Sequence, residues 1–437
     1  MRNSILVTVA LAAAIAGAKD VDVRDFGAKG DGATFDTEAV QKAIDDCSAA
    51  GGGRVTLAGG TFLVKPIMLK SGVDLHLDVT ARLLGSPDWK DYPNRGTFRH
   101  VDSSKLPRAR DAALIAADEQ ERIAISGRGV IDANGMRFVR PVKGAENKKW
   151  QYERIGGFDQ SPPRVVFFTG CRDVTVTDVT MTNQPAGWSY WIHDCDRVVF
   201  DRCKVLADVR FPNNDGIHVN SSRDVSISNC RVETGDDSIV VRCNNRSLRE
   251  NKVCARVTVA NCQLRSYANC IRLGWCQEGV IRDCAFSNIV LHDSSVGINI
   301  WFVPQDWNPA GDWGREKTRI ENVSFSNIVM DRIHGYPITV RVFDPAGFDA
   351  IRNVSFANMT CKSYGLPQFW GAKERPLEDF SFSNCRFIRD AASVAPWETA
   401  KPFDKPGENP FLHCRNFSFN GVTIDEDVEI KKGEQNK

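Results

Sequence analysis

Three aspartates stand in two short clusters near the middle of the chain. Asp215 lies in the segment NNDG, and Asp236 and Asp237 follow about one short repeat later in the segment GDD. Three carboxylates held close together repel one another, so the pKa of at least one of them rises. A protonated acid beside ionised ones can cleave a glycosidic bond, because it supplies a proton for the leaving oxygen and a base for water. The two clusters therefore predict acid–base chemistry if the fold brings them together.

Other interpretations exist for each cluster. An aspartate in NNDG is common in a turn on a solvated face, which is the structural alternative for Asp215 alone. A single acid followed by a pair at this spacing favours a functional site instead. Clustered carboxylates also bind calcium, which is the competing functional interpretation.

Short segments that alternate apolar and polar residues recur along most of the chain. Five valines are taken as equivalent and step by 24, 27, 32 and 23 residues: Val174, Val198, Val225, Val257 and Val280. A repeat of this length, with little helix between short strands, is typical of a solenoid whose units bury their apolar faces only by stacking. The expected fold is all-β, a single-stranded right-handed parallel β-helix. A β-sandwich would show more hairpin turns.

The two ends of the chain differ from the repeats. Residues 1–18 resemble a signal peptide, with Arg2 before an apolar run and a small-residue cleavage site. The catalytic β-helix is expected over 19–425 and a flexible tail over 426–437. The segment 36–50 predicts an amphipathic helix, capped by Asp36 or Thr37, that covers the open end of the solenoid. Loops at 88–110, 134–163 and 303–318 are expected to line the binding site and to close one end of it.

The composition of the chain limits the classes of binding partner that the protein is expected to have. The net charge is +1 over 437 residues, so neither nucleic acid nor an anionic membrane is indicated. After the leader, no segment is long and apolar enough for a membrane span. Seven of the 14 cysteines recur in contexts such as SNC and RDC, which is typical of small buried packing residues. We expect mostly free thiols in an exported protein.

Several motifs together resemble one known family. NNDG (213–216) with GDD (235–237) is similar to the paired acid motifs of the polygalacturonase-like family, glycoside hydrolase family 28. The segments VRDFGAKGDGATFDTEAVQKAIDDC (23–47) and LKSGVDLHLDVTARLLGS (69–86) resemble the start of that family. The resemblance runs from about residue 21 to about residue 390. It implies a right-handed β-helix, no metal or other cofactor, and hydrolysis with inversion of configuration.

The same resemblance implies roles for individual residues. Asp236 is the general acid, and Asp215 and Asp237 activate the water. Tyr336, in HGYPITV, matches a tyrosine near the scissile sugar, and Asn213 belongs to the substrate-binding set.

The chain departs from the family pattern at three positions. Asn269 stands where the family has a histidine, and Asn299 and Trp301 replace two cations that grip a galacturonate carboxylate. Aligning SIVVR (238–242), CIRLG (270–274) and GINIW (297–301) as successive rungs puts Arg272 in the column of Asn299 and Arg242 in that of Trp301. The two arginines then either supply the missing cations or neutralise the nearby aspartates. All five of these positions are predicted to contact substrate.

Aromatic residues supply a further indication. Trp275, Trp301, Trp307 and Trp313 follow the acid-bearing segments, and flat aromatic faces suit the apolar faces of sugar rings. The expected protein is a monomeric glycoside hydrolase, secreted or periplasmic, acting on pectic polysaccharide or oligosaccharide of the galacturonan or rhamnogalacturonan type. A β-helical polysaccharide lyase and a non-catalytic carbohydrate-binding solenoid are the alternatives.

Overall fold

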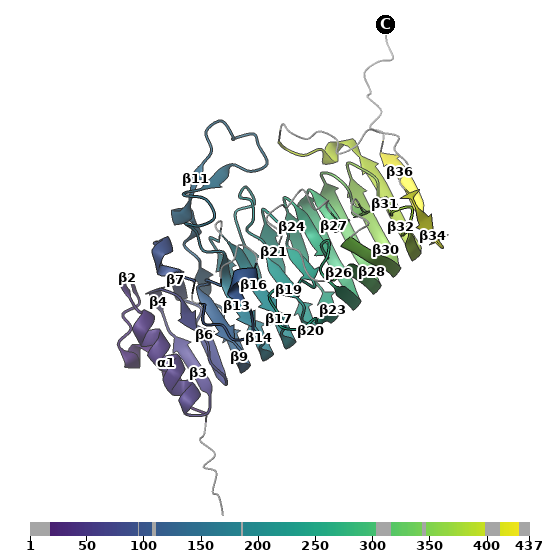
Figure 1. Ribbon diagram of the computed structural model, residues 1–437. Helices are drawn as coiled ribbons and strands as arrows, with labels where there is room; N and C mark the ends of the chain where they lie inside the picture. Colours follow the sequence, from purple (N-terminus) through teal and green to yellow (C-terminus); the bar gives the residue numbers. More distant parts are fainter. Residues whose placement is uncertain are drawn as a thin grey trace, which may run out of the picture.

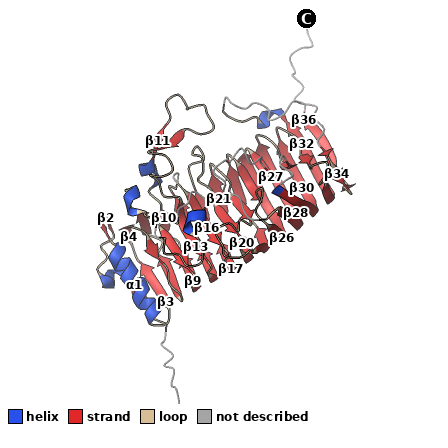
Figure 2. Ribbon diagram, in the orientation of Figure 1, coloured by secondary structure: helices blue, strands red, loops and turns tan. Residues whose placement is uncertain are grey.

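The computed structural model describes residues 18–94, 96–106, 111–184, 187–302, 316–342, 347–397 and 411–427. Strands stack in successive rungs along one axis, and helices are few (Figures 1 and 2). Two large sheets contain all but two of the described strands, and their strands pair in parallel. The predicted all-β parallel β-helix is confirmed. The predicted leader, residues 1–18, lies almost wholly outside the described residues, as does most of the predicted tail.

The larger sheet, here sheet A, forms one side of the solenoid. Within the described residues its strands are β1 (Val21–Asp22), β2 (Asp31–Phe35), β3 (Gly53–Leu57), β4 (Gly60–Val64), β6 (Val73–Leu77), β7 (Ala81–Gly85), β9 (Glu121–Ser126), β10 (Val130–Asp132), β14 (Arg172–Thr177), β15 (Thr180–Thr182), β17 (Asp196–Asp201), β18 (Lys204–Leu206), β20 (Arg223–Ser228), β21 (Arg231–Thr234), β23 (Val253–Ala260), β24 (Gln263–Ser266), β26 (Val280–Ser294), β28 (Thr318–Ile333), β30 (Phe348–Ser363), β32 (Leu377–Asp390), β34 (Cys414–Arg415), β35 (Ser418–Asn420) and β36 (Thr423–Asp427).

The smaller sheet, here sheet B, carries the candidate site. Its described strands are β5 (Ile67–Met68), β8 (Ile115–Asp118), β13 (Arg164–Thr169), β16 (Trp188–His193), β19 (Ile217–Asn220), β22 (Ile239–Arg242), β25 (Asn269–Leu273), β27 (Val296–Phe302), β29 (Ile338–Val342), β31 (Gln368–Trp370) and β33 (Phe411–Leu412). A separate antiparallel hairpin joins β11 (Val139–Pro141) and β12 (Tyr152–Arg154). Short 3-10 helices lie at η1 (Val23–Phe26), η2 (Trp89–Asp91), η3 (Ser103–Lys105), η5 (Gly135–Phe138) and η8 (Ala391–Ser393).

Helix α1 (Thr37–Ala49) lies at the N-terminal end of the stack (Figure 1). It buries one apolar face against the first rungs, as a capping element must. Asp36 occupies the N-cap position, but its carboxylate accepts hydrogen bonds from the backbone N–H groups of Lys29 and Gly30 rather than from the helix. The predicted capping helix is confirmed. No helix within the described ranges, α1 included, is long and apolar enough to cross a membrane.

The repeated valines form a column inside sheet A. Val174, Val198, Val225 and Val257 are in register on successive strands and are buried. The prediction for Val280 is wrong, because Val280 pairs with Val253 instead. Asp283, with φ +57°, takes the bend position that Arg256 takes one rung earlier, so the register puts Cys284 opposite Val257.

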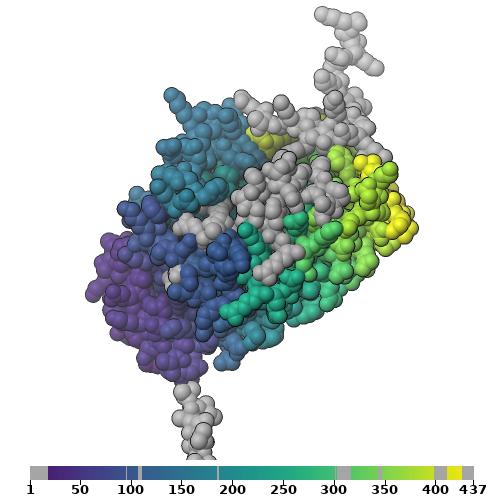
Figure 3. Space-filling model, in the orientation of Figure 1, coloured from purple at the N-terminus to yellow at the C-terminus, as the bar shows by residue number. Residues whose placement is uncertain are grey.

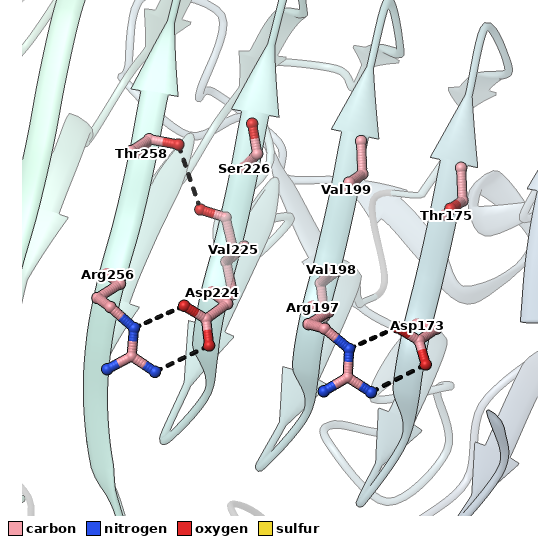
Figure 4. A pocket seen from close by; sticks show the side chains of 10 residues that line it. All are labelled: Asp173, Thr175, Arg197, Val198, Val199, Asp224, Val225, Ser226, Arg256 and Thr258. Carbon is pink, nitrogen blue, oxygen red and sulfur yellow. Dashed lines mark hydrogen bonds and ion pairs between the residues drawn. The ribbon is translucent and has the colours of Figure 1, made fainter. Parts of the chain in front are cut away.

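A second column runs along the outer edge of sheet A, where each strand bends. Asp173, Arg197, Asp224 and Arg256 all adopt φ between +53° and +55°, and they alternate in charge from rung to rung. Arg197 binds both carboxylate oxygens of Asp173 at 2.5 and 2.9 Å, and Arg256 binds Asp224 in the same way at 2.6 and 2.8 Å (Figure 4). In each ion pair, opposite charges on neighbouring rungs neutralise each other.

Cysteines also stack at equivalent positions of successive rungs. All 14 are free thiols, and 13 of them are buried. Cys203, Cys230 and Cys262 stand at equivalent positions of consecutive rungs, each just after a residue with positive φ. Small apolar thiols therefore fill the corner of the solenoid at this point.

Candidate active site

Sheet B brings the two acid clusters together. The register pairs Ile217 of β19 with Ile239 of β22, so Asp215 and Asp237 occupy equivalent positions just before these strands. The N–H of Gly216 donates to the carbonyl of Asp237 at 2.9 Å. Oxygens from the carboxylates of Asp215, Asp236 and Asp237 all lie within 4.8 Å of one another. The predicted convergence of the three acids is confirmed.

Asn214 holds the two acid-bearing turns in place. Its side chain is fully buried, donates to the carbonyl of Asp208 at 2.7 Å and accepts from the N–H groups of Gly235 and Asp236 at 2.7 and 3.2 Å. Gly235 is required here because a Cβ would lie 2.0 Å from the carbonyl oxygen of Phe211. The amide and the glycine together let two rungs approach closely enough for like charges to meet.

Asp236 is the most exposed of the three acids and is oriented by its neighbour. The backbone N–H and the side-chain amide of Asn213 both donate to Oδ2 of Asp236, at 3.0 and 3.1 Å. The N–H of Asp237 donates to the other oxygen at 3.0 Å. Asn213 thus positions an acid, and it also lines the pocket.

Asp215 is held by a histidine that the sequence alone did not single out. Nε2 of His218 lies 2.8 Å from Oδ2 of Asp215. His218 is buried and stacks on Trp188 and Trp191, each with a ring-centroid separation of 5.1 Å. Burial, assisted by the charge of Arg242, lowers the pKa of His218 to about 3. The neutral ring therefore donates its Nε2–H to Asp215, which favours the ionised form of that carboxylate.

Asp237 has a strongly raised pKa. It is only 4% exposed, and burial raises its pKa to about 7, with further increases from the charges of Asp236 and Asp215. Arg272 and Asn269 oppose this increase. Asp237 therefore retains its proton close to neutral pH.

A ladder of buried amides leads away from Asp237 along sheet B. Nδ2 of Asn269 donates to Asp237 at 2.5 Å, Nδ2 of Asn299 donates to Asn269 at 2.7 Å, and the hydroxyl of Thr339 donates to Asn299 at 2.8 Å. Asn269 and Asn299 are 7% and 4% exposed and do not line the pocket. In this structure they contact Asp237 and one another, so their predicted substrate contact stays a prediction.

The two predicted arginines occupy the expected columns. Arg272 pairs with Asn299 in the strand register, and both arginines line the pocket. Nη1 of Arg272 lies 3.3 Å from Asp237, and its guanidinium lies 3.5 Å from the ring centroid of Trp275. Arg242 instead forms an ion pair with the fully buried Glu278. Arg272 therefore neutralises Asp237, which belongs to the acid cluster. Arg242 does not neutralise the cluster, because its partner Glu278 lies outside it.

The pocket has a volume of about 180 Å³. Its lining comprises Trp188, Asn213, Asp215, His218, Asp236, Asp237, Val240, Arg242, Arg272, Gly274 and Trp275. Trp275 is thus the predicted tryptophan that the described structure brings to the site. The side chain of Trp301, together with Trp307 and Trp313, lies outside the described residues. Tyr336 is buried two rungs beyond Asn269 and packs against the guanidinium of Arg341 at 4.8 Å.

The outer face of sheet B is covered on the N-terminal side of the acids. Phe167 and Trp191 lie in register there, and both are completely buried. They pack beneath Phe98 from the predicted loop 88–110 and Leu248 from the connection after β22. The cluster comprises Phe98, Val101, Leu106, Ala113, Ala116, Phe167, Trp188, Trp191 and Leu248.

The predicted loop 134–163 also reaches the site. It contains the β11–β12 hairpin, which projects beyond the stacked rungs (Figures 1 and 3). The indole N–H of Trp150 donates to the carbonyl of Gly235 at 3.3 Å, directly before Asp236. Nη1 of Arg154 lies 3.5 Å from the side-chain oxygen of Asn213. Lys149, beside Trp150, is a further nearby cation that sequence reasoning missed.

Stacked carboxylates in a pocket on one sheet of a parallel β-helix form an arrangement that suits acid–base hydrolysis. Residues 47–249 match the family described as Glycosyl hydrolases family 28, and the match covers slightly less than half of the chain. The matched segment includes the three acids and ends before Asn269.

Two relatives illustrate the similarity. The chain is 28% identical over 253 residues to an exo-poly-α-D-galacturonosidase of Dickeya chrysanthemi, covering 51% of this chain and 41% of that protein. It is 27% identical over 316 residues to a probable polygalacturonase of Vitis vinifera, covering 68% of this chain and 60% of the relative. The alignments thus span about two fifths and three fifths of these proteins.

A solved structure supports the fold. The exopolygalacturonase of Thermotoga maritima matches with a TM-score of 0.67 at 21% identity, covering 93% of this chain and 91% of the other. The β-helix is right-handed, as predicted.

Proposed function

We propose that this protein hydrolyses glycosidic bonds in pectic polysaccharide or oligosaccharide. The observation that carries the proposal is the convergence of three carboxylates in one pocket, with a pKa of about 7 at Asp237. Such a cluster holds a proton to donate and a carboxylate to activate water under the same conditions. The family match over residues 47–249 and the two relatives support a pectic substrate.

The roles follow from exposure and hydrogen bonding. Asp236, the most accessible acid, donates the proton to the leaving oxygen, as the family resemblance implies. Asp215 and Asp237 stack directly and together orient a water for attack at the anomeric carbon. His218 donates its Nε2–H to Asp215, and Arg272 counters the charge of Asp237. In the free protein the raised pKa lies on Asp237, so substrate must shift the shared proton toward Asp236.

Inversion of configuration is part of the proposal and has a direct test. One oxygen from each carboxylate lies within 4.8 Å of the others, whereas the usual separation in inverting enzymes, roughly 6.5–9.5 Å, is measured between whole carboxyl groups. We nevertheless assign inversion, because the stacked Asp215–Asp237 pair can hold a water jointly. Proton NMR of the first product formed should show the anomer opposite to the substrate linkage. The original anomer would exclude single displacement.

We also infer that the protein acts at chain ends. The outer face of sheet B is filled by Phe167 and Trp191 immediately before the acids and is covered by Phe98 and Leu248. A polysaccharide cannot continue through this covered region. The expected products are short from the earliest time points, with only a slow decrease in the viscosity of the polymer. A rapid decrease in viscosity would indicate internal cleavage.

The decisive experiment is a panel of pectic polysaccharides and oligosaccharides with product analysis, run beside Asp236→Asn. A hydrolase yields new reducing ends without an ultraviolet-absorbing unsaturated product, and a lyase yields that product. A binding solenoid yields neither. Activity that survives Asp236→Asn would overturn the assignment of the acid.

We propose export on the basis of residues 1–18. Mass spectrometry of the mature N-terminus tests this. A chain that retains Met1 would argue against cleavage of a leader.

A further inference from the structure

The cations that line the pocket are already engaged. Arg272 contacts Asp237, and Arg242 forms an ion pair with Glu278, which is fully buried. A uronate that enters a partly dry site needs its own charged or polar partner, because burying an unpaired carboxylate is costly. The pocket lining therefore contributes less positive charge than its two arginines suggest.

The β11–β12 hairpin places another cation near the acids. Trp150 is tied to the carbonyl of Gly235 at 3.3 Å, and the N–H of Gln151 donates to the carbonyl of Arg210 at 2.8 Å. Arg210 lies in the connection that leads to Asp215. Both anchors thus attach the hairpin to the two rungs that carry the acids.

Lys149 lies against Trp150 and close enough to the acid cluster for the charges of Asp236 and Asp237 to act on it. Its ammonium lies 4.5 Å from the ring centroid of Trp150, and the side chain is half-buried. The charges of Asp236 and Asp237 act on it, yet burial prevails and lowers the pKa of Lys149 to about 8. Among the described residues no ion pair involves Lys149. A partly dehydrated, unpaired ammonium beside an active site suits an anionic ligand group.

We propose that Lys149 is a specificity-determining residue that binds the carboxylate of the uronic acid unit seated at the acid cluster. This inference rests on the proposed function and names the charge that the site selects. The hairpin thereby supplies the cation that Asn299 cannot supply from sheet B. Trp150 fixes the position of the ammonium, so that binding costs little side-chain entropy.

The alternative is that Lys149 only offsets the negative charge of Asp236 and Asp237. Removing the charge of Lys149 weakens activity in both cases. The two roles predict different effects on the binding of a neutral sugar. A charge-neutralising lysine affects charged and neutral sugars alike through the acids. A carboxylate-binding lysine affects only the uronate.

The test compares Lys149→Met with Lys148→Met, an exposed lysine one residue earlier in the same loop. Calorimetry measures the binding of monomeric galacturonate and monomeric galactose, neither of which has a bond to cleave. Lys149→Met should weaken galacturonate binding by about 10- to 100-fold, the usual effect of losing a charged hydrogen bond. Galactose binding should be unchanged, and Lys148→Met should match the wild type. Thermal melting curves check that both variants fold.

The inference is overturned by equal weakening toward both sugars, or by unchanged galacturonate binding in Lys149→Met. Failure of wild-type protein to bind galacturonate more tightly than galactose also overturns it. Hydrolysis does not enter these measurements, so the proposed function is judged separately by the substrate panel. A protein that binds galacturonate through Lys149 but cleaves nothing would uphold the inference and refute the hydrolase.

Discussion

The two sheets of the solenoid use the same stacking geometry with opposite electrostatics. On sheet A, Asp224 stacks beside Arg256, and the charges cancel between rungs (Figure 4). On sheet B, Asp215 stacks beside Asp237, and no cation separates them in the column. One arrangement stabilises the stack, while the other raises a pKa. A repeated scaffold therefore becomes a reactive site where the alternation of charge is broken.

Burial accentuates the contrast. The side chains of Asp224 and Arg256 are 44% and 50% exposed, so water screens their interaction. Those of Asp215 and Asp237 are 7% and 6% exposed, where charges interact more strongly. Equivalent substitutions on the two sheets should therefore have very different consequences.

The largest contrast is expected between Asp236→Asn and Asp224→Asn. The first removes the proposed proton donor and should lower kcat/KM by about 10²- to 10⁴-fold. The second changes an exposed ion pair on sheet A and should leave kcat/KM unchanged. Steady-state kinetics on a pectic oligosaccharide measures both. Similar losses in the two variants would mean that activity reflects folding rather than the acid.

Asn269→Ala should alter the pH profile. The amide hydrogen bond favours the ionised form of Asp237, so its removal raises the pKa of that group, by about 1–2 units for a charged hydrogen bond. The limb of the pH profile of kcat/KM that reports the ionisation of Asp237 should move to higher pH.

A matched control is Asn261→Ala on sheet A, whose side chain donates to Asn229 at 3.3 Å. Its profile should coincide with that of the wild type. An unshifted profile for Asn269→Ala would show that the amide ladder has no effect on the proton of the cluster.

Asp237→Asn should remove the pH dependence that this acid imposes on stability. The folded-state pKa of Asp237, about 7, lies above its ordinary value of 3.8, so the folded state binds the proton more tightly. Its contribution to stability is therefore lost as the pH rises from 4 toward 7. The free energy of unfolding of Asp237→Asn, minus that of the wild type, should be about 2–3 kcal/mol larger at pH 8 than at pH 5. The variant therefore becomes more stable relative to the wild type as the pH rises.

Urea denaturation at the two pH values measures this difference, and any fixed cost of the substitution cancels. A difference that is independent of pH would mean that the pKa of Asp237 is not raised. Asp224→Asn should show the opposite sign if it shows any dependence, because its ion pair with Arg256 lowers the pKa of Asp224.

The smallest effect is expected for the sheet A pair itself. Asp224→Asn should lower the free energy of unfolding by less than about 1 kcal/mol, as is usual for exposed ion pairs. Added salt should reduce the difference further. A larger loss, measured by urea denaturation at low and high salt, would show that the column contributes more than screened pairs do.

The fold and the acid cluster were predictable because stacking follows from sequence spacing. The alternation around Val174, Val198 and Val225 identifies the rungs, and the spacing of Asp215 from Asp237 matches one rung. The error at Val280 arose because the column residue of that rung is Cys284 and not a valine.

The surroundings of the acids were less predictable. The role of His218 depends on its stacking against Trp188 and Trp191, which come from the preceding rung. Its position three residues after Asp215 was the available signal. Lys149 lies in a hairpin without periodicity, so no spacing rule connects it to Asp236.

The length of the rung between the acids has a practical consequence. In the register of sheet B, 22 residues separate Ile217 from Ile239, whereas 32 separate Ile239 from Ile271 and 40 separate Ile298 from Ile338. Longer rungs accommodate extra loops without disturbing their strands. The 22-residue interval that carries the acids has no extra loop of this kind. A one-residue deletion there should therefore abolish the pocket. The hairpin and the longer rungs are then the modules to exchange when the preference for a sugar is to be re-engineered.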